Sequence, residues 1–183
     1  LPICEEKRDW HPQIENPPRP PPPPPRVTSK PPPDAGEPDM ELRQLGKPSR
    51  VWTYRDTDGG VLGYVARYET SEGKEIRCWT WGTTGVDQCR WGCGHWNKPR
   101  PLYCLEQLSS RISAPVVICE GEKTADAAQA LLTAYVAVTW PGGASAWKHA
   151  DWTPLKGRTV LLWPDNDEPG IKAMRDLAEH LSD

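Results

Sequence analysis

The 183-residue sequence contains no phenylalanine, so ten tryptophans and five tyrosines supply all of its aromatic surface. It has no apolar run of the roughly 18 residues that a membrane-spanning helix needs, since LLTAYVAVTW is the longest candidate. The first residues, LPICEEKRDW, have no apolar stretch after their charges, unlike a secretory signal peptide. These patterns exclude a membrane-spanning helix and predict no association with a membrane.

A basic charge excess is also missing. The net charge is -3 and the isoelectric point is about 5.9, so any contact with nucleic acid needs a local basic patch. The sequence has no G-x-x-x-x-G-K-S/T motif and therefore no P-loop motor. Its six cysteines lack the regular spacing of a secreted disulfide framework. We expect a cytoplasmic protein with reduced thiols. The start without methionine suggests a processed chain or an excised piece.

Proline is abundant at the start, where fifteen of the 22 prolines precede residue 49. Because proline has no N–H to donate, NPPRPPPPPPRVTSKPPPDAGEP is predicted to form neither helix nor sheet. The run from Pro20 to Pro25 favours polyproline II. We predict a disordered Pro-rich arm or linker over residues 1–48. The alternative is an SH3-type ligand, since Arg19 and Arg26 flank the run.

A small β-rich subdomain is predicted over residues 49–110. VWTYRDTDGGVLGYVARYET contains two β-rich runs around DTDGG, which is a strong signal for a hairpin. EIRCWTW, at residues 75–81, favours a third strand. The following stretch, GTTGVDQCRWGCGHWNKPRPLY, has little periodicity, and LEQLSSR after it favours a short helix.

Strands and helices alternate over residues 111–183. PVVICE, YVAVTW and RTVLLWPD are short apolar runs typical of strands buried on both faces. GEKTADAAQALLTA favours a helix, as does PGIKAMRDLAEHLSD, which begins with proline in its first turn. This alternation predicts an α/β domain with a mostly parallel sheet flanked by helices.

Three carboxylates are expected at one edge of that sheet. Glu120 and Asp165 each follow a predicted strand, and Asp167 comes two residues later. Since sites form at the carboxyl ends of parallel strands, the three groups should converge and repel one another unless a cation neutralises them. Oxygen ligands of this kind suit Mg²⁺ or Mn²⁺. The alternative is that Asp-Asn-Asp before Pro-Gly serves only as a turn and helix cap.

VVICEGEKTADAA and LLWPDNDEPG together resemble the Toprim domain, which bacterial and phage primases, topoisomerases and some nucleases share. Its signatures are Glu-Gly after one strand and Asp-x-Asp after a later strand, with a glycine three residues beyond. The matching residues are Glu120, Gly121, Asp165, Asp167 and Gly170. PGGASAWKHADW and the region before the domain are similar to primase–helicase proteins of phages, prophages and plasmids, so the resemblance covers about residues 50–183.

The resemblance implies a Rossmann-like Toprim fold over residues 111–183 and the activity of a DNA primase of a mobile element. Glu120, Asp165 and Asp167 would hold Mg²⁺ or Mn²⁺ for nucleotidyl transfer, with Glu120 also proposed as a general acid or base. The implied partners are single-stranded DNA template, ribonucleotides and a replicative helicase, in cis or in trans. A metal-dependent nuclease and a non-catalytic DNA-binding or scaffolding module of a helicase remain alternatives.

Further residues are candidates for contact with nucleic acid or nucleotide. Lys123 begins the helix beside Glu120, and the PGG loop would let backbone approach a ligand closely. The full set is Lys123, Gly121, Gly143, Lys148, Arg77 and Arg100. The sequence departs from many Toprim proteins at Thr124, where they have an acidic residue, and Asp126 is expected on the helix surface.

Two clusters in the Gly/Trp-rich stretch leave alternatives open. A zinc site would use C-x3-C-x-H-x8-C, but this spacing lacks two paired knuckles, and isolated thiols are the favoured interpretation. Its members are Cys89, Cys93, His95 and Cys104. Tryptophans interleaved with basic residues could stack on single-stranded template or form the core of the β subdomain, which is favoured. These tryptophans are Trp79, Trp81, Trp91 and Trp96.

Overall fold

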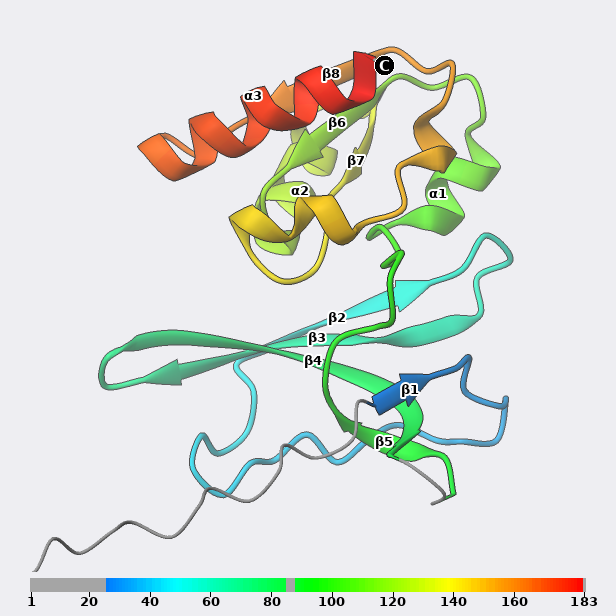
Figure 1. Ribbon diagram of the computed structural model, residues 1–183, viewed down its shortest axis with the longest axis vertical. Helices are drawn as coiled ribbons and strands as arrows, with labels where there is room; N and C mark the ends of the chain where they lie inside the picture. Colours follow the sequence, from blue (N-terminus) through cyan, green and yellow to red (C-terminus); the bar gives the residue numbers. More distant parts are fainter. Residues whose placement is uncertain (1–25, 85–87, 183) are drawn as a thin grey trace, which may run out of the picture.

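The computed structural model describes residues 26–84 and 88–182, which form two separate β-sheets (Figure 1). The antiparallel sheet contains β1 (Arg26–Thr28), β2 (Arg50–Arg55), β3 (Val61–Thr70), β4 (Gly73–Thr84) and β5 (Arg90–Cys93). The parallel sheet contains β6 (Val116–Cys119), β7 (Val136–Val138) and β8 (Val160–Trp163). The helices are α1 (Leu105–Ser110), α2 (Glu122–Leu131) and α3 (Glu168–Ser182), with the short 3-10 helices η1 (Ala144–His149) and η2 (Thr153–Leu155). No helix in these two ranges is long and apolar enough to cross a membrane.

The hairpin predicted around DTDGG is confirmed by the antiparallel pairing of β2 with β3. Asp56 closes its turn, because Oδ1 accepts the backbone N–H groups of Asp58 at 3.1 Å and Gly60 at 2.7 Å. Gly59 takes a φ of 84°, which side chains rarely allow. The long strands β3 and β4 then pair from Gly63↔Thr80 to Thr70↔Gly73 and form the centre of the sheet.

The chain before β2 covers one face of this sheet. Tyr64, Tyr68 and Trp79 are buried on that face, and Met40 and Leu45 pack against them. β1 pairs with the end of β4 in the same sheet. None of its three residues is proline, so each has a backbone N–H that can donate a hydrogen bond. The disordered arm was predicted over residues 1–48, and of these the structure describes residues 26–48, which contain β1 and the segment that packs on the sheet. The polyproline run lies in residues 1–25, outside the described part of the chain.

The parallel sheet has the strand order β7-β6-β8. All four residues of β6 are buried, as its apolar sequence predicts, because α2 packs on one face of the sheet and α3 on the other. β8 differs from the prediction of a strand buried on both faces. Leu161 is 42% exposed and Trp163 is 40% exposed, which is typical of an edge strand.

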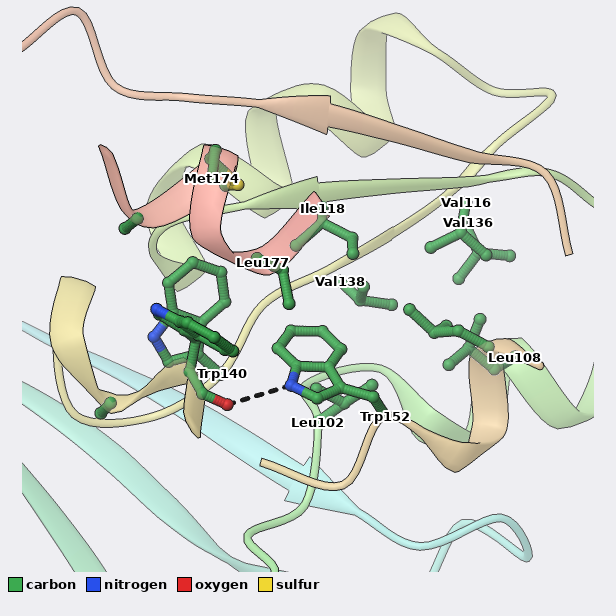
Figure 2. Packing of buried hydrophobic residues seen from close by; sticks show 14 residues of the cluster. Leu102, Leu108, Val116, Ile118, Val136, Val138, Trp140, Trp152, Met174 and Leu177 are labelled. Carbon is green, nitrogen blue, oxygen red and sulfur yellow. Dashed lines mark hydrogen bonds between the residues drawn. The ribbon is translucent and has the colours of Figure 1, made fainter. Parts of the chain in front are cut away.

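Tryptophan replaces phenylalanine as the large filler of the core between the parallel sheet and α3. Trp140 and Trp152 meet edge to face with ring centroids 5.9 Å apart, beside Leu177 of α3 (Figure 2). The indole N–H of Trp152 donates to the carbonyl oxygen of Trp147 at 3.0 Å, so the polar atom is satisfied inside the core. In the antiparallel sheet, Trp79 is also buried and thus serves the β core.

The predicted fold class, a mostly parallel Rossmann-like Toprim sheet flanked by helices, is wrong for this chain. The larger sheet is antiparallel with five strands, and only three short strands pair in parallel. The described residues contain three α-helices and two short 3-10 helices. The prediction gave most weight to the strand–helix alternation after residue 111 and treated the preceding β region as a small addition. That region instead contains the two longest strands, β3 with 10 residues and β4 with 12.

The packing of α3 gives a test of this core. Leu177→Ala should lower the free energy of unfolding by about 2–5 kcal/mol, because Leu177 is fully buried and its removal leaves a cavity. Ile171→Ala, on the same helix but 44% exposed, should change it by less than about 0.5 kcal/mol. Urea unfolding followed by tryptophan fluorescence measures both. Equal effects of the two substitutions would show that α3 does not pack as described.

Candidate functional site

A pocket of about 540 Å³ lies between the antiparallel sheet and the carboxyl ends of the parallel strands. Its size is in the range of small-molecule sites. One wall comes from β2, β3, β4 and the segment after β5, and the other from the loops that follow β6, β7 and β8. The lining residues are Trp52, Arg67, Lys74, Ile76, Cys78, His95, Glu120, Gly121, Glu122, Lys123, Thr124, Trp140, Gly142, Gly143, Ala144, Asp165 and Asp167.

All three carboxylates predicted to form a site line this pocket. Glu120 directly follows β6 and Asp165 follows β8, and these strands pair in parallel up to Cys119↔Trp163. Oε1 of Glu120 accepts the backbone N–H of Asp165 at 2.9 Å. The side chain at the end of one strand thus fixes the backbone at the end of its neighbour.

Gly170, in the first turn of α3, lies next to two of the carboxylates. Its N–H donates to Oδ1 of Asp167 at 2.8 Å. A Cβ at this position would lie 2.2 Å from Oε1 of Glu120 and 3.0 Å from Oδ1 of Asp167. No side chain fits there while Glu120 stays in place, which gives a physical reason for glycine three residues after Asp167.

The electrostatics of the carboxylates favour a cation. Burial raises the pKa of Glu120, and the charges of Asp165 and Asp167 raise it further, against the opposing effect of the Asp165 N–H. In residues 26–84 and 88–182, no three Asp, Glu, His or Cys side chains form a group that could hold a metal ion. Mg²⁺ does not need three such ligands, since it commonly binds one or two carboxylates and keeps water and phosphate oxygens as its other ligands. The donors present fit that open mode of binding.

Basic side chains line the same pocket. Lys123 lies in the first turn of α2, and Arg67 and Lys74 come from the β3–β4 hairpin. Arg67 is held by Glu69, with Nε donating to Oε1 at 2.7 Å. No motif in the sequence marks Arg67 and Lys74 as residues of the site. Side chains alternate between the two faces of a strand, so the sequence of β3 predicts Arg67 on the same face as Val65. It does not predict that this face lies opposite Glu120.

The other predicted nucleotide-binding residues divide into two groups. Gly121, Lys123 and Gly143 line the pocket. Lys148 lines a different cavity, and its ammonium lies 5.4 Å from the ring centroid of Trp147. Arg77 is paired with Ala66 on the sheet face that points away from the pocket, and it forms an ion pair with Glu75.

Arg100 lies beside the PGG loop. Its Nη1 donates to the carbonyl oxygen of Pro141 at 3.3 Å, and it is adjacent to Gly142, which lines the pocket. The backbone N–H of Arg100 donates to the carbonyl oxygen of His149 at 2.6 Å, and this bond holds Arg100 in place.

Two acidic residues of α2 join the two walls. Glu122 is buried and its Oε1 accepts the hydroxyl of Tyr54 at 2.8 Å. Asp126, expected on the helix surface, accepts three hydrogen bonds, two from β2 of the other wall and one from the segment before α1. The donors are Arg50 Nη2 at 2.7 Å, Trp52 Nε1 at 2.9 Å and the Tyr103 hydroxyl at 3.0 Å.

The proposed zinc ligands are not gathered in one place. Cys89 and Cys93 are exposed and Cys104 is buried, and all three are free thiols. His95 instead contacts Cys78, with Nδ1 3.2 Å from Sγ. The described residues contain no group of three or more potential zinc ligands.

The sequence model of a family described as "Domain of unknown function (DUF6371)" matches residues 46–166. The chain belongs to this family. The DUF6371 match runs from before β2 to beyond β8, so all lining residues of the pocket except Asp167 lie within the matched region, Glu120 and Asp165 included. Comparison with the curated proteins and with the solved structures gives no match.

Gly170 allows a double-mutant test of the crowded carboxylates. Gly170→Ala should destabilise the fold, although alanine in a helix normally gains up to about 1 kcal/mol over glycine, because its Cβ would meet Glu120. In a Glu120→Ala background the same change should lose most of this cost. Urea unfolding of the two single variants and the double variant gives the coupling energy. Gly121→Ala, with open space at its Cβ, is the matched control. Additive effects would contradict the contact.

The buried Glu122 predicts a pH dependence of stability. Burial raises the pKa of Glu122 in the folded protein. The unfolded chain then loses this proton at lower pH than the folded one, so stability falls as pH rises above about 4.3, the ordinary glutamate value. Glu122→Gln should flatten this slope, and the exposed Glu179→Gln should not. Urea unfolding across pH in EDTA measures it. An unchanged slope in Glu122→Gln would contradict the assignment.

Proposed function

We propose that the protein is the catalytic region of a DNA primase from a mobile-element replication protein. It makes short RNA primers on single-stranded DNA by metal-dependent nucleotidyl transfer. The main support is the pocket in which carboxylates from two adjacent strand ends meet basic side chains from the facing sheet. The similarity of the Glu-Gly and Asp-x-Asp motifs to those of primases adds to this support.

Mg²⁺ or Mn²⁺ would be held by Glu120, Asp165 and Asp167, and when bound it would neutralise nucleotide phosphates and promote ionisation of the attacking 3′-hydroxyl. Oε1 of Glu120 accepts the Asp165 N–H, so Oε2 is the oxygen that would face the ligand. Glu120 would also act as the general acid or base for the proton of that hydroxyl.

The basic residues would orient the substrate. Lys123, close in sequence to Glu120, would contact the phosphates of the incoming ribonucleotide. Arg67 and Lys74 on the β3–β4 hairpin would contact the phosphate backbone of the template, which carries the charge that such side chains bind.

The proposed setting is the cytoplasm, where the free thiols of the described cysteines would stay reduced. The proposed partners are single-stranded DNA, ribonucleotides and a replicative helicase, fused to this region or separate. The chain has no P-loop of its own, so any unwinding would come from that helicase.

Primer synthesis from labelled ribonucleotides on single-stranded DNA tests the proposal. Glu120→Gln and Asp165→Asn should each lower synthesis by about 100-fold or more, because each removes a charged group from the reacting centre. Asp176→Asn on α3, in a surface ion pair with Lys172, is the matched control and should retain activity.

A cleavage assay on the same DNA runs in parallel. Metal-dependent cleavage without synthesis, lost in Glu120→Gln, would replace the primase with a nuclease. DNA binding without either activity, unchanged in Glu120→Gln, would make the region a non-catalytic module.

A further inference from the structure

Cys78 and His95 form a close pair in the wall of the pocket opposite Glu120, and the proposed reaction does not use them. Cys78 lies on β4 and His95 follows β5, and Sγ and Nδ1 are 3.2 Å apart. Cys78 is only 4% exposed, whereas His95 is exposed, and both line the pocket. The thiol is thus behind the ring, and the ring is the group that a ligand can reach.

The protonation states of the pair decide what the ring offers. Burial raises the pKa of Cys78 to about 12, so the thiol keeps its proton at neutral pH. Burial, and then the charge of Arg100, lower the pKa of His95, so the ring is neutral. A protonated thiol donates to Nδ1, and the proton of a neutral ring is then on Nε2. We assign His95 as a hydrogen-bond donor through Nε2–H.

The same states argue against a nucleophilic Cys–His pair. A cysteine nucleophile reacts as the thiolate and needs access to its substrate. Cys78 is buried and protonated, so it cannot take that part. Its geometry is suited to holding the ring of His95.

A second donor converges on the same place. A Cβ at Gly142 would lie 2.7 Å from Nη1 of Arg100 and 3.2 Å from Cε1 of His95, so both side chains border the backbone of the PGG loop. Gly142 has a φ of 107°, which keeps side chains out of this position. Nη1 of Arg100 donates to the carbonyl oxygen of Pro141, so the guanidinium is held beside this loop.

We propose that His95 forms an anion subsite of the pocket, which binds a phosphate oxygen of the substrate through Nε2–H, with the positive charge of Arg100 beside it. His95 is the binding residue, and Cys78 is a positioning residue that fixes the orientation and tautomer of its ring. The subsite takes a phosphate group of a nucleoside triphosphate, and in this choice of ligand it rests on the proposed function.

Binding without metal tests the subsite separately from catalysis. Isothermal titration of the full chain with ATP, and with inorganic tripolyphosphate, in EDTA gives a Kd for each probe. His95→Ala should raise both values about tenfold or more, the loss expected for one hydrogen bond to a charged group. His95→Gln keeps an N–H donor near the position of Nε2 and should restore most of the affinity. His180→Ala, an exposed histidine on α3, should bind as the wild type does.

The positioning role of Cys78 has its own readouts. Cys78→Ala should weaken probe binding several-fold, and Cys78→Ser, which keeps a donor to Nδ1, should weaken it less. Nitrogen-15 NMR of the histidine rings should show the Nε2–H tautomer for His95 in the wild type and a mixture of tautomers in Cys78→Ala. Urea unfolding of each variant checks that the fold is kept.

The outcomes separate the subsite from the proposed function. Probe binding that depends on His95, in a protein that makes no primers, would support the subsite and reject the primase. Primer synthesis with wild-type Kd and KM in His95→Ala would reject the subsite and keep the primase. The subsite is also overturned if neither probe binds the wild-type protein, or if His95→Gln loses as much affinity as His95→Ala.

Discussion

The carboxylate of Asp126 holds the two sheets together, and the pocket depends on it. It accepts hydrogen bonds from Arg50, Trp52 and Tyr103, and one turn earlier in α2 Glu122 accepts the hydroxyl of Tyr54. Hydrogen bonds to charged groups are stronger than neutral ones, and a buried partner left without one is costly. Since α2 begins directly after Glu120 and Gly121, these bonds also set the position of Glu120 relative to β3 and β4.

The remaining geometry of the site follows from how two parallel strands end. β6 and β8 pair to their last residues, so Glu120 and the turn after β8 are brought to one edge without any contribution from the antiparallel sheet. Of the basic residues, Arg67 and Lys74 come from the β3–β4 hairpin, which belongs to the other sheet, whereas Lys123 lies on α2 beside the carboxylates. The pocket therefore combines side chains from both sheets, and it exists only when both are folded and docked.

Local signals in the sequence predicted the local structure well. DTDGG predicted the hairpin, VVIC the buried strand β6, and the strand-end positions of Glu120 and Asp165 their shared edge. Contacts between distant residues could not be predicted in this way. Asp126 and its donor Arg50 are 76 residues apart, and β1 pairs with strand residues more than 50 positions later. The fold class failed for the same reason, because the motifs identify strand ends and carry no information on how the larger antiparallel sheet is built. Lys148 was misplaced because η1 directs it over Trp147, which a linear motif cannot show.

The carboxylate of Glu120 has two demands placed on it in this structure. Oε1 of Glu120 anchors the backbone of Asp165 at the end of the edge strand β8, and it belongs to the carboxylate that faces the pocket. Any cation that draws this carboxylate toward itself competes with the N–H of Asp165. Filling the pocket and tethering the edge strand are therefore thermodynamically linked. The turn between β8 and α3 is then the part of the molecule whose motion reports whether the pocket is occupied.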